Sequence, residues 1–175
     1  MQSNISNFIG SRCIDISPRE IPEGTTLVEA GSEVGRSIFR YALSVTALGK
    51  PCRALAIDKS GGAPGNDVQA AFSATCGGIV RSAFDETFRL SGLLDIIEVS
   101  GSDSADSAKP FADGSVQGVF IHAGHSTEAV RRDFAAWHPK FAPGSLSAGH
   151  DIDAPSVNAA SPQPYIAAGR CEVKQ

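Results

Sequence analysis

Histidine and aspartate side chains gather in two short stretches of the chain, His122 to His125 and His150-Asp151. Neutral imidazoles and carboxylates can hold divalent metals, and the same groups remove protons as general bases. We therefore take His125, His150 and Asp151 as candidate catalytic residues, with Asp151 also a candidate metal ligand. The alternative is that His125 caps the following helix and that His150 is a buried, hydrogen-bonded ring.

A second candidate site is the stretch 26–37, TLVEAGSEVGRS, whose pattern indicates a strand, a glycine turn and the start of a helix. Glu29 stands at the strand end, and Gly31 and Gly35 follow with four-residue spacing. Such a turn offers backbone N–H groups and the positive end of a helix dipole, as nucleotide sites do. The alternative is a tight turn that serves only the fold.

Three other classes of site are disfavoured by their missing motifs. The glycine spacing differs from the G-x-G-x-x-G of dinucleotide sites, which argues against a nicotinamide oxidoreductase. No G-x-x-x-x-G-K-[ST] is present, which disfavours a P-loop NTPase, and no G-x-S-x-G is present, which disfavours a serine hydrolase.

Alternating strands and helices must position these residues. Apolar runs predict five strands, at 26–30, 52–58, 96–99, 116–122 and 145–151. Helical periodicity predicts helices at 35–48, 66–76, 79–91, a short one ending near 109, and 127–138. Pro143-Gly144 predicts a turn, and 165–173 is a candidate last strand. This alternation predicts an α/β three-layer sandwich with a mainly parallel, Rossmann-like sheet.

In parallel sheets of this kind, ligands lie beyond the carboxyl ends of the strands. Asp58-Lys59 follow the second predicted strand, where an acid can accept hydrogen bonds from ribose hydroxyls; the alternative is a solvated carboxylate. Asp103-Ser104 follow the third strand and predict a helix cap, a contact to a base, or both. Arg131, Arg132 and Asp133 predict a solvated helix face, and Trp137 a core position.

Composition limits the kind of protein. The chain has 175 residues, 42% of them hydrophobic and 19% charged, with a net charge of −4. We expect one domain over residues 25–175 after an N-terminal arm or short helix, 1–24. The acidic balance predicts neither nucleic-acid nor membrane binding. With no visible secretory signal and four scattered cysteines, we expect free thiols and a cytoplasmic location.

Two runs carry a family resemblance: VEAGSEVGRS followed by AID, and ADGSVQGVFIHAGHSTEAVRRDFAAWHPKFAPGSLSAGHDIDAPSV. They resemble class I S-adenosylmethionine-dependent methyltransferases over about residues 26–157. The resemblance is greatest to the small-molecule O-methyltransferase-like group, whose fourth strand ends in D-G-D-H-S-Y and whose fifth ends in G-H-D. It implies a class I methyltransferase fold, here shortened at its C-terminal end.

The resemblance also implies roles for individual residues. His125, His150 and Asp151 would face the methyl acceptor, where some family members bind a divalent metal. Those expected to bind S-adenosylmethionine are Glu29, Ala30, Gly31, Ser32, Gly35, Ser37, Asp58, Lys59, Asp103, Ser104 and His122.

Two functions follow from the resemblance. The first is S-adenosylmethionine-dependent methyl transfer to the hydroxyl of a small-molecule acceptor, by a chain that could form homo-oligomers. The alternative is a cofactor-binding or degenerate methyltransferase-like domain with a structural or regulatory role. It is motivated by the fourth-strand motif, which reads His122-Ala123-Gly124-His125 here and lacks both acids of the family pattern.

Overall fold

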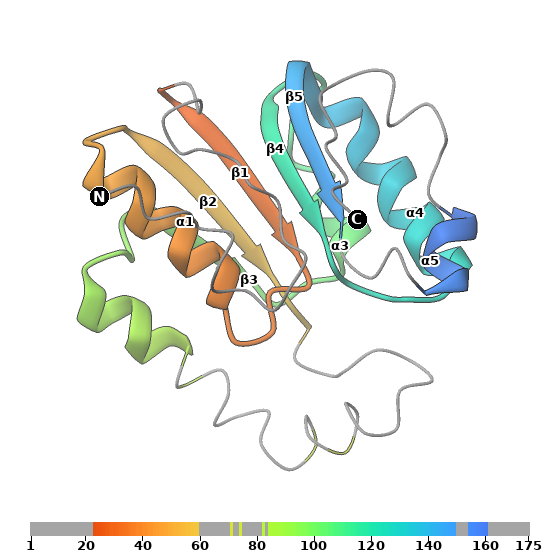
Figure 1. Cartoon of the computed structure of the whole chain (residues 1–175), viewed down its shortest axis with the longest axis horizontal. Coiled ribbons are helices and arrows are strands. Elements are labelled where there is room, and N and C mark those ends of the chain that lie inside the picture. Colours follow the sequence, from red (N-terminus) through yellow and green to blue (C-terminus); the bar gives the residue numbers. More distant parts are fainter. Residues whose placement is uncertain are drawn as a thin grey trace.

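A sheet of five parallel strands forms the centre of the computed structural model (Figure 1). The structure describes residues 23–59, 71, 74, 82, 84–149 and 154–160. The strands are β1 (Thr25–Ala30), β2 (Cys52–Ile57), β3 (Ile97–Ser100), β4 (Val116–Ile121) and β5 (Phe141–Gly149). Their order is β3-β2-β1-β4-β5, so the direction of winding reverses between β1 and β4. The predicted Rossmann-like α/β fold is confirmed.

Helices cover both faces of this sheet (Figure 1). One face carries α1 (Arg36–Ala47) and the helical residues 84–91. The other carries α3 (Ser104–Ser107) and α4 (Thr127–Trp137), which continues into η3 (His138–Lys140), with α5 (Pro155–Ala160) packed on α4. None of the helices described is long and apolar enough to cross a bilayer.

Each face has its own apolar core. On the α1 face the buried cluster is Ile38, Ala42, Ala54, Ala56, Phe84, Phe88, Leu93 and Ile97. On the α4 face it is Val28, Leu55, Ile57, Ala108, Val116, Val119, Ile121 and Trp137. Alternate residues of the central strands thus pack into the two cores, which explains why the sequence of these strands is almost continuously apolar.

The first four strands lie within one residue of their predicted bounds, but the fifth begins earlier than predicted. Val116 pairs with Phe141, whereas Gly118 already pairs with Leu146, so the intervening residues of β5 form an irregular bulge. Pro143-Gly144 was therefore wrongly predicted as a turn between elements. Proline and glycine are tolerated at such an irregularity because Pro143 cannot donate to the ladder and Gly144 adopts φ +76°.

Helix α5 was not predicted, because proline and polar residues dominate its surroundings in the sequence. Its Val157 and Ala160 pack with Val130 of α4, so a tertiary contact defines it. Several other predictions lie outside the described residues: 1–22 of the N-terminal arm, most of the helix at 66–76 and the last strand at 165–173.

Candidate functional site

The polar residues that follow the strands meet at the carboxyl edge of the sheet. Ala30 at the end of β1 pairs with Ile57 of β2 on one side and with Ile121 of β4 on the other. Ile57 in turn pairs with Ser100 of β3. Because these strand ends are in register, the structure brings together the predicted residues that follow β1, β2, β3 and β4.

Gly31 lies tightly against the segment that follows β4. It adopts φ +90°, and a Cβ atom there would lie 2.1 Å from the His122 carbonyl oxygen. The His122 N–H donates to the Ala30 carbonyl at 2.7 Å, which holds the segment after β4 against the segment after β1. The fold itself therefore requires glycine here, whatever ligand the turn accepts.

Gly35 is required for a different contact. It precedes α1 in the left-handed region, with φ +74°, and a Cβ atom would lie 2.2 Å from the Phe84 ring. The backbone N–H groups of the turn also have partners within the protein. Gly31 and Ser32 donate to the Ile57 carbonyl, and Glu33 donates to Asp58 Oδ2 at 2.6 Å. The sequence pattern had indicated that these N–H groups would be presented to a ligand, which is wrong for this conformation.

Glu29 lies beneath the turn rather than on its surface. It is 2% exposed, and its Oε1 accepts a hydrogen bond from the Ser37 hydroxyl of α1. Burial raises its pKa from 4.5 to about 7, although hydrogen bonds from Ser37, Ser32 and the Ile38 backbone act in the opposite direction. Glu29 and Ser37 thus join the end of β1 to the start of α1.

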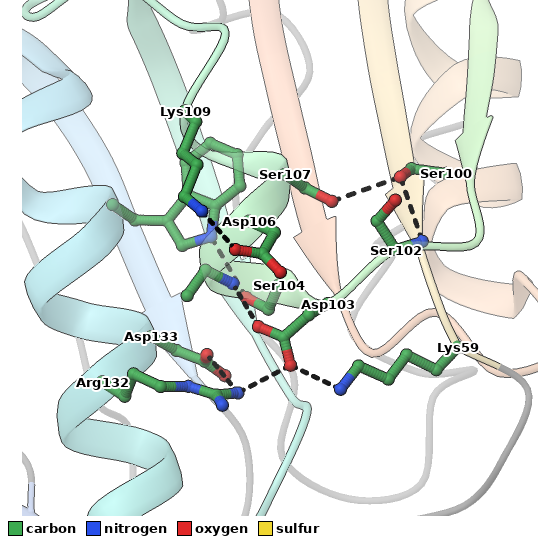
Figure 2. A network of polar contacts seen from close by, with 12 residues as sticks. Lys59, Ser100, Ser102, Asp103, Ser104, Asp106, Ser107, Lys109, Arg132 and Asp133 are labelled. Atoms are coloured by element: carbon green, nitrogen blue, oxygen red, sulfur yellow. Dashed lines mark hydrogen bonds and ion pairs between the residues drawn. The ribbon is translucent and has the colours of Figure 1, made fainter.

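Asp58 and Lys59 connect the end of β2 to both neighbouring loops. The Asp58 carboxylate accepts from Glu33 in the turn after β1, and its N–H donates to the Ser100 carbonyl of β3 at 2.9 Å. Lys59 extends to Asp103, with Nζ 2.5 Å from Oδ2 (Figure 2). The half-buried Asp58 carboxylate therefore lies at the carboxyl edge, where the resemblance implies a ribose ligand.

Asp103 caps α3, which confirms one of the two roles predicted for it. Its Oδ1 accepts from the Ala105 N–H at 3.0 Å. Its Oδ2 accepts from two cations, Lys59 and Arg132, the latter at 2.9 Å (Figure 2). Partial burial opposes ionisation, but the bonds from Lys59 and Ala105 and the charge of Arg132 outweigh it and lower the pKa of Asp103.

Asp133 corrects a prediction, because it is buried rather than solvated. It is 1% exposed, and its Oδ1 lies 3.6 Å from Arg132 Nη2. Burial raises its pKa and the nearby Asp103 charge acts in the same direction, whereas Arg132 and the Ser104 hydroxyl act in the opposite direction. The spacing held a signal for this position: Asp133 is three residues after Val130 and four before Trp137, both core residues.

Trp137 is a core residue, as predicted, and it fixes Ser104. The ring is fully buried, and its Nε1–H donates to Ser104 Oγ at 3.1 Å. Ser104 is itself only 6% exposed. The hydroxyl therefore anchors the start of α3 against α4.

The two described histidines of the fourth-strand motif lie together. The rings of His122 and His125 stack with centroids 5.7 Å apart. The His125 carbonyl accepts from the Ser156 hydroxyl of α5 at 2.7 Å, and Ser126, not His125, caps α4. His150 and Asp151 lie outside the described residues, and within the described ranges no cluster of three metal-ligating side chains occurs.

A parallel sheet of order 3-2-1-4-5, with polar residues beyond the carboxyl ends on both sides of its switch point, has the architecture of class I methyltransferases. Residues 28–152 match the methyltransferase domain family. The chain belongs to this family, which confirms the broader part of the resemblance. None of the curated proteins compared with the sequence matches it.

Solved structures with the same fold share little sequence with the chain. A structure titled as a putative rRNA-methylase from Clostridium thermocellum has TM-score 0.52 and 15% identity, over 74% of this chain and 61% of that one. A putative sarcosine dimethylglycine methyltransferase from Galdieria sulphuraria has TM-score 0.50 and 13% identity, over 72% and 39%. A geranyl diphosphate methyltransferase in complex with SAM has TM-score 0.48 and 18% identity, over 75% and 42%. The chain thus spans less than two thirds of these structures.

Proposed function

We propose that the chain transfers a methyl group from S-adenosylmethionine to the hydroxyl of a small-molecule acceptor. The observation that carries this proposal is the common position of Gly31, Asp58, Asp103 and His122 beyond four in-register parallel strands, on both sides of the switch point. The family match supports the reaction class. The hydroxyl acceptor rests on the O-methyltransferase-like run from Phe120 to Asp151.

The residues at the carboxyl edge fit an adenosyl ligand. The Asp58 carboxylate can accept hydrogen bonds from ribose hydroxyls, because it is half-buried at the strand edge. Asp103 and Ser104 lie beside it at the start of α3, where the base would fit. When bound, S-adenosylmethionine supplies a methyl group on a positively charged sulfur.

The acceptor would lie at the β4 end. His125 is our candidate base for the acceptor proton, and the stacked His122 ring restricts its orientation. Holding the hydroxyl oxygen and the methyl group in line would supply much of the rate enhancement. A divalent metal at Asp151 stays a prediction, as do a homo-oligomer and a cytoplasmic location.

The test is methyl transfer from labelled S-adenosylmethionine to a panel of hydroxylated, amino and thiol acceptors. We expect turnover with a hydroxylated acceptor, reduced about 100-fold or more by His125→Ala. His138→Ala, in the exposed η3, is the matched control and should retain full activity. Cofactor binding without turnover on any acceptor would instead favour the degenerate domain, and turnover confined to amines or thiols would exclude the hydroxyl acceptor.

A further inference from the structure

Arg132 lies between two carboxyl groups that differ in exposure (Figure 2). Its Nη2 is 2.9 Å from Asp103 Oδ2 and 3.6 Å from Asp133 Oδ1. Asp103 is at the carboxyl edge of the sheet, whereas Asp133 is 1% exposed on the inner side of α4. One guanidinium nitrogen thus has a close partner and a second, more distant one.

If Asp133 were ionised, its buried Oδ1 atom would need a hydrogen-bond donor. In the described residues, Asp133 Oδ1 is buried and has no hydrogen-bond partner. An ionised carboxylate with such an oxygen is costly, so a neutral carboxyl group fits this arrangement. If Asp133 does ionise, Arg132 Nη2 is the cationic donor in position to approach it.

A movement of Arg132 toward Asp133 would remove a hydrogen-bond donor from Asp103 Oδ2. In the present arrangement it accepts from both Lys59 Nζ and Arg132 Nη2, while Oδ1 accepts from the Ala105 N–H. Two cations on one carboxylate oxygen leave it little capacity for another donor. Withdrawal of Arg132 would restore that capacity at the carboxyl edge.

Within the described part of the chain, few charged groups lie near Asp133. Asp103 and Ser104, at the start of α3, both act on Asp133. Lys59, which follows β2, forms an ion pair with Asp103. Arg132 comes from α4 itself. Asp106 and Lys109 of the α3 region form an exposed ion pair, and the Lys109 charge also interacts with Asp103. The described helix α5, PSVNAA, contributes no charged side chain.

We propose that Arg132 is a positioning residue, shared between Asp103 and Asp133, whose position sets how well Asp103 accepts a hydrogen bond from an amino group of the bound nucleoside. With Asp133 neutral, Arg132 holds Asp103 Oδ2. When Asp133 loses its proton to solvent, Arg132 moves toward Asp133 Oδ1 and Oδ2 becomes available. The nucleoside contact rests on the proposed function, but the movement of Arg132 does not.

The direction of the pH effect follows from the burial of Asp133. Burial raises the pKa of Asp133, so its ionisation falls at higher pH than for an exposed aspartate. Affinity for an adenosyl ligand should therefore rise with pH through this titration. One gained hydrogen bond corresponds to an increase of about threefold to tenfold.

The binding test compares S-adenosylhomocysteine with its inosine analogue, which lacks the exocyclic amino group, by calorimetry from about pH 5 to pH 9. The ratio of the two affinities cancels the titrating groups that contact only the parts common to both ligands. We expect this ratio to rise about threefold to tenfold in the wild type and to stay flat in Asp133→Asn. In Arg132→Gln the ratio should stay at its high value at every pH. Arg131→Gln, which within the described residues removes a bond to the Ala159 carbonyl, should behave as the wild type.

A second measurement without cofactor separates this inference from the proposed function. NMR of the Arg132 guanidinium should show a shift that follows the titration of the Asp133 carboxyl carbon, and Asp133→Asn should abolish it. If S-adenosylhomocysteine does not bind at any pH, the proposed function fails while the guanidinium titration still decides whether Arg132 is shared. A pH-independent guanidinium, or a wild-type affinity ratio as flat as that of Asp133→Asn, would overturn the inference.

Discussion

Among the described residues, each face of the sheet buries one carboxyl group, and the two groups are stabilised differently. On the α1 face, Glu29 is surrounded by the Ser37 and Ser32 hydroxyls and the Ile38 backbone, and its described surroundings include no cation. On the α4 face, Asp133 lies beside Arg132, whose exposed side chain also pairs with the partly buried Asp103. Burial raises both pKa values. The difference teaches that one buried acid is held by hydroxyl and backbone groups, whereas the other shares an exposed cation with a carboxylate at the sheet edge.

The largest expected loss in the free energy of unfolding is at Gly31, in the turn above Glu29. Gly31→Ala should cost roughly 3–5 kcal/mol in the free energy of unfolding, because its Cβ would meet backbone atoms that cannot move aside. Gly114→Ala is the matched control: φ is +72°, nothing lies within 4 Å of the added atom, and the cost should be about 1 kcal/mol. Urea denaturation measures both, and equal losses would show that the Gly31–His122 contact is not tight.

The next effect concerns the ionisation of Glu29. Its folded-state pKa is raised from 4.5 to about 7, so the stability it contributes is complete below pH 4.5 and is lost as the pH rises toward 7. Across that window the loss should be roughly 3 kcal/mol. Glu29→Gln should remove this slope, whereas Glu98→Gln, with an exposed side chain on β3, should retain it. Parallel pH profiles for wild type and Glu29→Gln would contradict the burial of this group.

The α4 face should respond to loss of one buried hydroxyl. Ser104→Ala leaves the buried Trp137 Nε1–H without its acceptor and should cost about 1–3 kcal/mol. Ser115→Ala removes an exposed bond to the Ala112 carbonyl and should cost less than about 0.5 kcal/mol. Thermal unfolding distinguishes them. If the Ser115 variant is as destabilised as the Ser104 variant, the α3–α4 contact does not depend on this hydroxyl.

The smallest effect is expected where charges are fully solvated. The Arg53–Glu98 pair joins two side chains that are 76% and 67% exposed. Arg53→Ala should change the free energy of unfolding by less than about 0.5 kcal/mol, because solvent screens such pairs. A larger loss, measured by urea denaturation at low salt and abolished at high salt, would mean that exposed pairs matter here as much as buried contacts.

The sheet could be predicted from the sequence because its pattern is local. Buried strands are short apolar runs, and parallel pairing places the residues that follow them at one edge, so the grouping of Gly31, Asp58, Asp103 and His122 needed no further information. The bulge at Pro143-Gly144 was missed because the same two residues also favour ordinary turns.

Other features depend on tertiary contacts that no local pattern shows. Asp133 was assigned to a solvated face because Arg131 and Arg132 precede it, but α4 packs on other elements, including α3, and Asp133 is buried. The N–H groups of the glycine turn looked available in the sequence, but the carbonyl of Ile57 and the carboxylate of Asp58 reach them from β2. Both errors come from partners distant in the chain.

The central claim is that the carboxyl edge binds an adenosyl ligand through Asp58. Calorimetry with S-adenosylhomocysteine tests it most directly, on the wild type, Asp58→Asn and Asp95→Asn. Asp95 is an exposed acid just before β3, at the opposite end of that strand. We predict measurable binding by the wild type and Asp95→Asn, weakened about tenfold to 100-fold in Asp58→Asn, which loses charged acceptors for the ribose. Absence of binding to the wild type at millimolar ligand, or equal affinities in all three proteins, would contradict the account.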